Sequence, residues 1–216
     1  MKQYDKIEYY NKIPFGLDCI AFDKLDGSNL RFEWGAKKGW YKFGTRNVMI
    51  DRTNEQFGIG IDIFLNKYGE KLDNIFKTKY KKVLSFVVFC EFYGDNSFAG
   101  QHLESDSKDV VLFDVNQYQK GIIDPFEFVD NFGELGIPKI IYKGDFNEEL
   151  VSDIKNNKYN LSEGVIIKGI KKTKKSSEVF MAKIKTKEWL NKVKDKFGEN
   201  YLLDELNGDQ NLINEY

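Results

Sequence analysis

Apolar and polar positions alternate in short runs along much of the chain, which is the pattern of strands that bury one face and expose the other. The longest apolar run is VLSFVVFCEFYG at residues 83–94, and its β-branched and aromatic residues predict a central strand. Shorter runs predict further strands at residues 17–22, 29–34, 39–45, 110–115, 164–170 and 179–185. The chain is therefore rich in short strands that follow one another in groups.

Helical spacing of apolar residues replaces this alternation in three segments, which are residues 54–78, 125–135 and 186–197. Asp124 is a typical N-cap residue and Pro125 a typical first helical residue, so we expect the second helix to begin there. Strands grouped in hairpins, with helices inserted between the groups, indicate an α+β fold rather than an alternating β-α-β order.

Composition places the chain among globular proteins. Its 216 residues are 41% hydrophobic and 15% aromatic, which is enough to bury a core without disulfides or metals. Cys19 and Cys90 have no CxxC spacing and no histidine cluster beside them, so neither a zinc site nor a disulfide framework is indicated. The N-terminus lacks the apolar core of a signal peptide, and no run is long enough to span a bilayer. These observations predict a cytoplasmic protein with no membrane partner.

Charge is unevenly distributed, although the net charge is only −1. Residues 167–187 contain eight lysines and one acid, Glu178, whereas the residues after Gly198 contain five acids and no base. Such asymmetry is typical of a face that binds a polyanion. A solvated KKTKK loop would produce the same composition, so charge alone leaves both interpretations open.

Lys24 lies in the stretch AFDKLDGSNLRFEW, between two predicted strands and beside Gly27, which marks a tight turn. A lysine in such a turn is usually a solvated cation. It becomes a nucleophile at neutral pH only when its pKa is lowered, and neighbouring cations provide that shift. In the run FMAKIKTK, Lys183 and Lys185 lie on one face of a predicted strand and Ile184 on the other. This pair either supplies the neighbouring cations or protects an exposed edge strand.

Two carboxylates occupy positions where a strand pattern would bury them. Glu91 lies inside the longest apolar run, and Glu163 directly precedes the predicted strand GVIIKGI. A buried carboxylate needs an ion pair, hydrogen bonds or a metal ion, and Mg²⁺ that binds together with phosphates takes one or two carboxylates. In VVLFDV, strict alternation places Phe113 and Asp114 on opposite faces, and the pattern favours Phe113 as a core residue over a base-stacking one.

An ordered set of motifs gives these residues a common context. KLDG at Lys24 resembles the KxDG nucleophile motif of the covalent nucleotidyltransferases, the superfamily of ATP-dependent DNA ligases, RNA ligases and mRNA capping enzymes. FGTRN, VVFCEFYG, VVLFDV, EGVIIK and AKIK look like the later motifs of the superfamily in their order, so the resemblance spans residues 24–185. The extended form KLDGSN is similar to the phage-type nick-sealing RNA ligases. The resemblance implies a nucleotidyltransferase (ATP-grasp-like) fold of antiparallel sheets flanked by helices.

The resemblance also implies a ligation that uses ATP and a divalent cation, Mg²⁺ or Mn²⁺. Lys24 would attack the α-phosphate of ATP to form a lysyl-AMP intermediate and release pyrophosphate. The AMP would then move to a 5′-phosphate, and a 3′-hydroxyl would displace it as the strand is sealed. Glu91 would hold the ribose, Phe113 would stack on adenine, and Glu163 would bind the metal ion.

Lysines of the later motifs are implied to contact the phosphates of ATP. These residues are Lys168, Lys183 and Lys185. Their cationic field would also lower the pKa of Lys24 and stabilise the charge on the phosphoryl group that is transferred.

Nucleic acid is the implied partner, most directly RNA as a nicked duplex or as ends, in RNA repair. Asn29 and Arg46 would engage the 5′-phosphate, and Asp114 would approach the 3′-hydroxyl end. Alternatives are a minimal ATP-dependent DNA ligase, a capping-type guanylyltransferase that takes GTP, and a catalytically idle module that binds a nucleotide or RNA.

The segment after AKIK departs from the superfamily pattern. Ligases of this kind usually continue with an OB-fold or a helical domain, whereas residues 186–216 are all that follows here. We expect an adenylyltransferase domain at residues 1–190 and a short helical acidic tail at 191–216, with no OB-fold or full C-terminal domain. A minimal ligase, a chain that needs a partner protein in place of that domain, and a truncated chain all fit this expectation.

Aromatic and histidine side chains outside these motifs are predicted to be structural. We expect Trp34, Trp40 and Trp189 to pack in or beside the core rather than to stack on bases. His102, the only histidine, is assigned no catalytic role because a lone histidine is more often a loop or packing residue.

Overall fold

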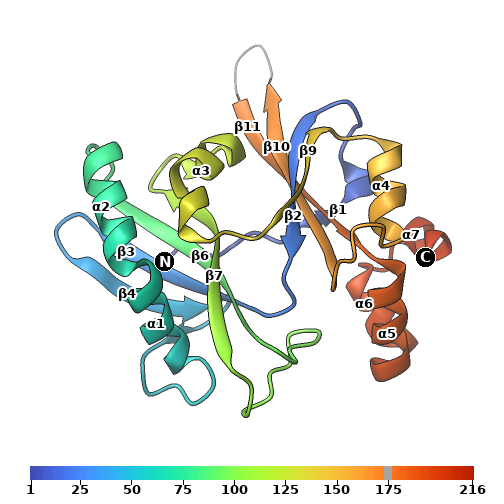
Figure 1. The fold of residues 1–216 in the computed structure, drawn as a ribbon, viewed down its shortest axis with the longest axis horizontal. Coiled ribbons are helices and arrows are strands. Elements are labelled where there is room, and N and C mark those ends of the chain that lie inside the picture. The colour runs from blue at the N-terminus through green and yellow to red at the C-terminus, as the bar shows by residue number, and fades with distance from the viewer. Residues whose placement is uncertain (173–176) are drawn as a thin grey trace. The chain divides into compact units, whose positions relative to one another are not determined.

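A computed structural model describes residues 1–172 and 177–216, and the chain divides into two units (Figure 1). Unit 1 consists of Met1–Lys6 and Asp26–Pro138, and unit 2 consists of Ile7–Leu25 and Lys139–Tyr216. Each unit has its own β-sheet and its own helices, which confirms the predicted α+β class.

The sheet of unit 1 has six strands in the order β5-β4-β3-β6-β7-β8, and every pair in it is antiparallel. Its strands are β3 (Ser28–Gly35), β4 (Gly39–Thr45), β5 (Met49–Ile50), β6 (Ser85–Gly94), β7 (Lys108–Gln117) and β8 (Gly121–Ile122). The helices of unit 1 are α1 (Gly58–Phe64), α2 (Glu70–Lys79) and α3 (Pro125–Phe132). The longest apolar run forms β6, which lies between β3 and β7 and is the central strand that the sequence predicts.

Aromatic side chains form much of the core of unit 1. The Phe32 ring from β3 stacks on Phe64 from α1 with ring centroids 3.7 Å apart, and Phe76 from α2 stacks on Phe86 from β6 at 3.9 Å. Trp34 is buried in the same cluster, as expected. One face of the sheet is thus covered by α1 and α2, so the opposite face is the one left for polar residues.

The helix predicted at residues 54–78 is instead two α-helices, α1 and α2, joined by a π-helical turn at Leu65–Gly69. A π turn frees a backbone carbonyl from the helical ladder. The indole Nε1 of the half-buried Trp40 donates a hydrogen bond of 2.9 Å to the Gly69 carbonyl. The interruption thus coincides with a contact from β4, which helical periodicity does not reveal.

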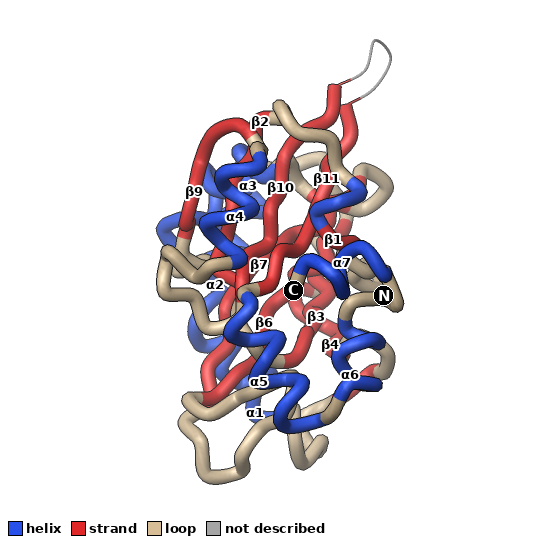
Figure 2. Tube along the Cα trace, turned by 90° about the vertical axis from the view of Figure 1, so that its right-hand side faces the viewer, coloured by secondary structure: helices blue, strands red, loops and turns tan. Residues whose placement is uncertain are grey.

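The sheet of unit 2 has five strands in the order β1-β11-β10-β2-β9, and only the β1 pair is parallel. Its strands are β1 (Glu8–Tyr9), β2 (Asp18–Lys24), β9 (Ile140–Asp145), β10 (Gly164–Lys172) and β11 (Ser177–Lys185). The helices of unit 2 are α4 (Glu148–Lys155), α5 (Lys187–Phe197), α6 (Glu199–Glu205) and α7 (Gln210–Glu215). The tube drawing follows α5, α6 and α7 in turn toward the C-terminus (Figure 2).

Side-chain caps begin several helices. The Asp124 carboxylate accepts hydrogen bonds from the Phe126 and Glu127 amides, which confirms the helix start expected there. Thr186 caps α5 by accepting from the amide of Trp189, and Trp189 itself is buried, as predicted. Strand β9 and helix α4 were not predicted, and Asn147 caps the start of α4.

The predicted boundary at residue 190 falls inside α5. The division into an adenylyltransferase domain and a tail remains a prediction. Among the residues that the structure describes, no helix is both long and apolar enough to cross a membrane.

Gly164→Ala is expected to destabilise unit 2. A Cβ at this position would overlap the carbonyl oxygen of Ile184 and lie 2.8 Å from the Lys185 Cα, so the backbone of β10 or β11 would have to move. Overpacking against backbone predicts a loss of about 3 kcal/mol in the free energy of unfolding, measured by denaturant titration. The control is Gly133→Ala, because its Cβ would lie at an ordinary 3.8 Å from Val129. Equal stability of the two variants would contradict this account.

Candidate functional site

Strand register in unit 2 places the predicted lysines on one face of the sheet. Lys24 of β2 lies opposite Gly164 of β10, and Gly164 lies opposite Lys185 of β11. Lys183 lies two residues before Lys185 and therefore on the same face. Ile184 points to the other face and is fully buried, so the predicted alternation of this strand is confirmed.

Lys168 belongs to the same face. It lies opposite Ile20 of β2, which is an even number of residues from Lys24, and opposite Met181 of β11, which is an even number of residues from Lys183. Residues at even spacing along a strand share a face. Its side chain is buried, and its ammonium lies 5.2 Å from the centroid of the Phe22 ring. The register thus places the four lysines that the motifs single out on one face of this sheet.

Glu163 joins two of these lysines. It is the residue just before β10, and its side chain is only 3% exposed. Its Oε2 accepts a hydrogen bond of 2.8 Å from the Nζ of Lys24, and its Oε1 accepts one from the Nζ of Lys185. The carboxylate at this strand end is therefore paired, as burial requires. The Lys24 side chain is 24% exposed, so it is only partly buried beside the ion pair.

A second carboxylate, which the sequence analysis did not single out, lies on the other two lysines. Glu205, the last residue of α6, places Oε1 3.1 Å from the Nζ of Lys183 and 3.2 Å from that of Lys185. Burial alone would raise the pKa of Glu205, but the charges of Lys185 and Lys183 outweigh it and hold that pKa at about 2. The result is an alternating row of charges, listed in order as Lys24, Glu163, Lys185, Glu205 and Lys183.

Burial has the opposite effect on Lys183. It lowers the pKa of the ammonium below its usual range, and the charge of Glu205 opposes that shift. The positive charges of Lys185 and Lys24 lower the Lys183 pKa further. Neighbouring cations therefore lower the pKa of Lys183, whereas the same effect on Lys24 stays a prediction.

The lysine-rich segment is less uniform than its composition suggests. Lys168 and Lys185 are buried, whereas Lys171 and Lys172 are exposed at the end of β10. Two further lysines of the predicted polyanion face, at positions 174 and 175, lie outside the described residues. Only part of the cluster is therefore a solvated surface.

The turn of the KLDG motif belongs to unit 1 from Asp26 onward. A Cβ at Gly27 would overlap the carbonyl oxygen of Phe92, so the close approach of the turn to β6 requires glycine. The Asp26 carboxylate accepts hydrogen bonds from the amides of Ala99 and Gly100, at 2.8 Å and 3.1 Å. The aspartate and glycine of the motif therefore shape and anchor the turn.

His102 is attached to the same turn. Its Nε2 lies 2.8 Å from the Ser28 hydroxyl, and its Nδ1 lies 3.0 Å from the Ser97 hydroxyl. Burial lowers the pKa of the imidazole. These contacts tie the start of β3 to the segment between β6 and β7.

The face of the unit 1 sheet opposite α1 and α2 carries predicted site residues. Asn29 of β3 lies directly opposite Glu91 of β6, and Asp114 of β7 lies opposite Phe89 of β6. Both polar atoms of the Asn29 amide are buried and have no hydrogen-bond partner within the described part of the chain. A buried amide needs hydrogen-bond partners, which water, an ion or a ligand can supply.

The expected alternation at Phe113 and Asp114 is wrong. Register shifts between Phe89 and Cys90 of β6, and this β-bulge leaves Phe113 without an opposite residue. Phe113 and Asp114 consequently both contact Tyr4: Phe113 contacts its ring, and Asp114 accepts a hydrogen bond from its hydroxyl. Phe113 is half-buried and stands outside the buried core cluster, so the core assignment is also wrong.

Tyr4 is a further residue of this face that the sequence analysis missed. Its ring lies 4.8 Å from Phe89 and 5.1 Å from Phe113, and its hydroxyl donates to the Asp114 carboxylate. Burial raises the pKa of Tyr4, followed by the charge of Asp114; Glu91 adds to the shift and Arg46 opposes it. The predicted Arg46 is exposed in the turn between β4 and β5. No motif marked Tyr4, because its neighbours come from distant strands.

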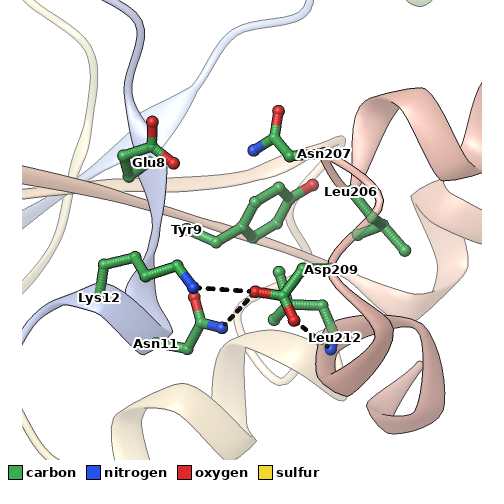
Figure 3. A pocket seen from close by; sticks show the side chains of 8 residues that line it. All are labelled: Glu8, Tyr9, Asn11, Lys12, Leu206, Asn207, Asp209 and Leu212. Carbon is green, nitrogen blue, oxygen red and sulfur yellow. Dashed lines mark hydrogen bonds and ion pairs between the residues drawn. The ribbon is translucent and has the colours of Figure 1, made fainter.

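Unit 2 also contains a cavity of about 290 Å³ (Figure 3). The Asp209 carboxylate accepts hydrogen bonds from Lys12 and Asn11 at 3.1 Å and 2.9 Å. Its lining residues are Glu8, Tyr9, Asn11, Lys12, Leu206, Asn207, Asp209 and Leu212. None of the residues predicted for the site lines it, so it is not the predicted nucleotide site.

Residues for a divalent cation are few. No group of three or more His, Cys, Asp or Glu side chains that could hold a metal ion exists among the described residues. Glu163 supplies one buried carboxylate, which suits Mg²⁺ or Mn²⁺ when substrate phosphates and water complete the coordination. A cation at Glu163 would need further oxygen ligands, and both Glu163 oxygens already accept hydrogen bonds from ammonium groups.

Two of three comparisons with known proteins give matches. The family model described as RNA ligase matches residues 18–185. A structure of Naegleria gruberi RNA ligase with PPi matches with a TM-score of 0.65 and 17% identity, over 91% of this chain and 59% of that chain. A lysine-to-alanine variant with ATP and Mn and a glutamate-to-alanine variant with AMP and Mn match equally. The chain spans about three fifths of these relatives' length, and no curated protein sequence matches it.

Proposed function

Because the chain belongs to the RNA ligase family, we propose that it is an ATP-dependent RNA ligase that forms a lysyl-AMP intermediate on Lys24. The observation that carries this proposal is the position of Lys24 on a sheet face with Lys168, Lys183 and Lys185. A nucleophilic lysine and several phosphate-binding lysines are what adenylyl transfer from a triphosphate requires. The fold shared with the Naegleria structures supports the same assignment.

The first step joins Lys24 to AMP. The neutral amine attacks the α-phosphorus of ATP, a P–N bond forms, and the bond to the bridging oxygen breaks with release of pyrophosphate. Lys24 must lose a proton in this step, and Glu163 Oε2 already accepts its hydrogen bond at 2.8 Å. Glu163 is therefore positioned both to hold the ammonium and to receive its proton.

The remaining lysines of unit 2 bind phosphates in this proposal. Lys183, Lys185 and Lys168 carry positive charge on the face from which Lys24 acts. Partly buried cations in fixed positions stabilise charge that develops on the transferring phosphoryl group and on the leaving pyrophosphate. Mg²⁺ or Mn²⁺ held by Glu163 would supply further charge stabilisation on the phosphates.

Unit 1 supplies the nucleoside and nucleic-acid contacts. We assign Phe113 to stacking on adenine and Glu91 to the ribose hydroxyls. The half-buried Phe113 ring and the position of Glu91 on the polar sheet face support these roles. Asn29 and Arg46 are assigned to the 5′-phosphate and Asp114 to the 3′-hydroxyl end, where Tyr4 positions the Asp114 carboxylate.

The polynucleotide is a nicked RNA duplex or RNA ends, as in phage-type nick-sealing RNA ligases that act in RNA repair. The support for this finer assignment is the motif KLDGSN. Sealing assays with RNA or DNA on the 3′-hydroxyl side of a nick test it. Sealing only with RNA is expected, whereas equal sealing of an all-DNA nick would indicate a minimal DNA ligase instead.

Incubation with α-labelled ATP and Mg²⁺, followed by a denaturing gel and peptide mapping, tests the activity itself. We expect a labelled band whose label lies on the peptide that contains Lys24. Labelled GTP serves as the comparison, because a capping-type enzyme would prefer it. A well-folded protein that takes no label from ATP would contradict autonomous adenylylation and favour a binding module.

A further inference from the structure

Helix α6 places an anion on the two lysines of β11. The Glu205 carboxylate lies 3.1 Å from Lys183 and 3.2 Å from Lys185, and it also accepts a hydrogen bond of 3.5 Å from the Tyr9 hydroxyl. Tyr9 of β1 lies opposite Lys183, and its ring is 4.4 Å from that ammonium. The carboxylate therefore lies over the sheet face that carries Lys183 and Lys185, at the edge formed by β1 and β11.

The contacts of Lys185 leave little room for a second anion. Its ammonium donates to Glu163, lies 3.2 Å from Glu205 and stacks 3.6 Å from the centroid of the Trp189 ring. An ammonium has three donors, so two carboxylates take up most of its capacity. A phosphate oxygen brought to both lysines would meet the like charge of Glu205, which remains ionised because its pKa is held at about 2.

The attachment of α6 suits a movable element. None of the residues of α6 is buried, and its Tyr201 and Leu203 are exposed. Gly198 and Gly208 flank the helix with φ values of 87° and 64°, conformations that glycine adopts without strain. Toward β11 this helix is held by the ion pairs of Glu205, next to the buried Leu206 that follows it, whereas toward α5 its Tyr201 ring stacks on Phe197 with centroids 4.8 Å apart.

We propose that Glu205 is an internal competitor of the substrate: its carboxylate occupies the position on Lys183 and Lys185 that a polyphosphate takes, and the phosphates must displace it. This inference rests on the proposed function, which gives those lysines to the phosphates of ATP. Helix α6 then reports on the site, because it is held while the site is free and released when a polyphosphate binds.

Glu205→Gln tests the proposal, with inorganic tripolyphosphate as the probe in calorimetric titrations. Removing the competing charge while keeping the shape is expected to lower the Kd about tenfold. The matched control is Glu199→Gln, which makes the same charge change in the same helix at an exposed residue paired with Lys194. Its Kd should stay within about twofold of the unsubstituted protein. An unchanged or higher Kd in Glu205→Gln, or an equal decrease in Glu199→Gln, would overturn the proposal.

Hydrogen exchange of the unsubstituted protein gives a second test that does not depend on the folding of a variant. Saturating tripolyphosphate is expected to speed amide exchange at residues 199–206, because α6 loses its tie to β11. Unchanged exchange in this segment at saturation would also overturn the proposal.

The competitor role of Glu205 and the ligase assignment can fail independently. If α-labelled ATP gives no lysyl-AMP but Glu205→Gln still binds tripolyphosphate more tightly, the ligase assignment fails and the competitor role stands. If labelling of Lys24 is normal but the tripolyphosphate Kd does not fall, the ligase assignment stands and the competitor role fails.

Discussion

Lys24→Arg is expected to abolish lysyl-AMP formation while leaving unit 2 folded. Arginine keeps a cation within reach of the buried Glu163 carboxylate, so the ion pair that stabilises this strand end is preserved. A guanidinium is not deprotonated in proteins and cannot act as the nucleophile. Label from α-labelled ATP should fall below detection, a loss of at least about 1,000-fold. The thermal midpoint should stay within about 3 °C of the unsubstituted protein.

The matched control is Lys192→Arg, an exposed lysine of α5 whose ammonium pairs with Glu188 at 2.7 Å. It should label as the unsubstituted protein does, because it lies on none of the strands that carry the site. Retained label in Lys24→Arg, mapped to another lysine, would remove Lys24 from the mechanism. Lys24→Ala removes both the charge and the nucleophile and leaves Glu163 with one partner. Comparing it with Lys24→Arg therefore separates loss of charge from loss of the nucleophile.

Glu163→Gln is expected to slow adenylylation by about 100-fold or more. The amide keeps the shape of the carboxylate but has one acceptor oxygen, whereas Lys24 and Lys185 each need one. Its NH₂ group would face an ammonium, and the proton acceptor for Lys24 is lost. The free energy of unfolding should fall by about 3 kcal/mol, because a buried ion pair loses one partner. Single-turnover labelling and denaturant titration measure the two effects separately.

Glu178→Gln is the control for Glu163→Gln, since Glu178 is an exposed carboxylate of the same β10–β11 hairpin. It should change neither labelling nor stability appreciably. A metal titration adds a readout that a structural role would not alter: Glu163→Gln should need more Mg²⁺ or Mn²⁺ to reach half of its own maximal rate. Full labelling activity of a folded Glu163→Gln protein would contradict both of its proposed roles.

Local regularity explains the parts of the fold and site that the sequence predicts. Periodicity predicts the central strand β6 and the shared strand face of Lys183 and Lys185. The capping preference of one residue predicts the N-cap at Asp124. The order of the motifs predicts a candidate set from Lys24 to Lys185, and the family model matches that range. These features depend on residues that are near one another in the chain.

Features that depend on distant residues were not predictable in this way. The bulge at Phe113 arises where β7 pairs with β6, and strict alternation therefore misplaces Asp114. Tyr4 reaches Asp114 from a segment more than a hundred residues away, and no pattern in the N-terminal residues signals it. Strand β9 is mostly half-exposed or exposed, so it lacks the apolar run by which strands are recognised.

The sequence by itself determined the α+β class, the candidate nucleophile and the types of residue around it, because these follow from local periodicity and from motifs of fixed spacing. Only the tertiary structure decided how those charges are paired. Register across three strands brings Lys24 and Lys185 to the same carboxylate, and α6 folds back to place Glu205 on Lys183. Long-range pairing of this kind is set by packing and strand order, which leave no periodic trace in the chain.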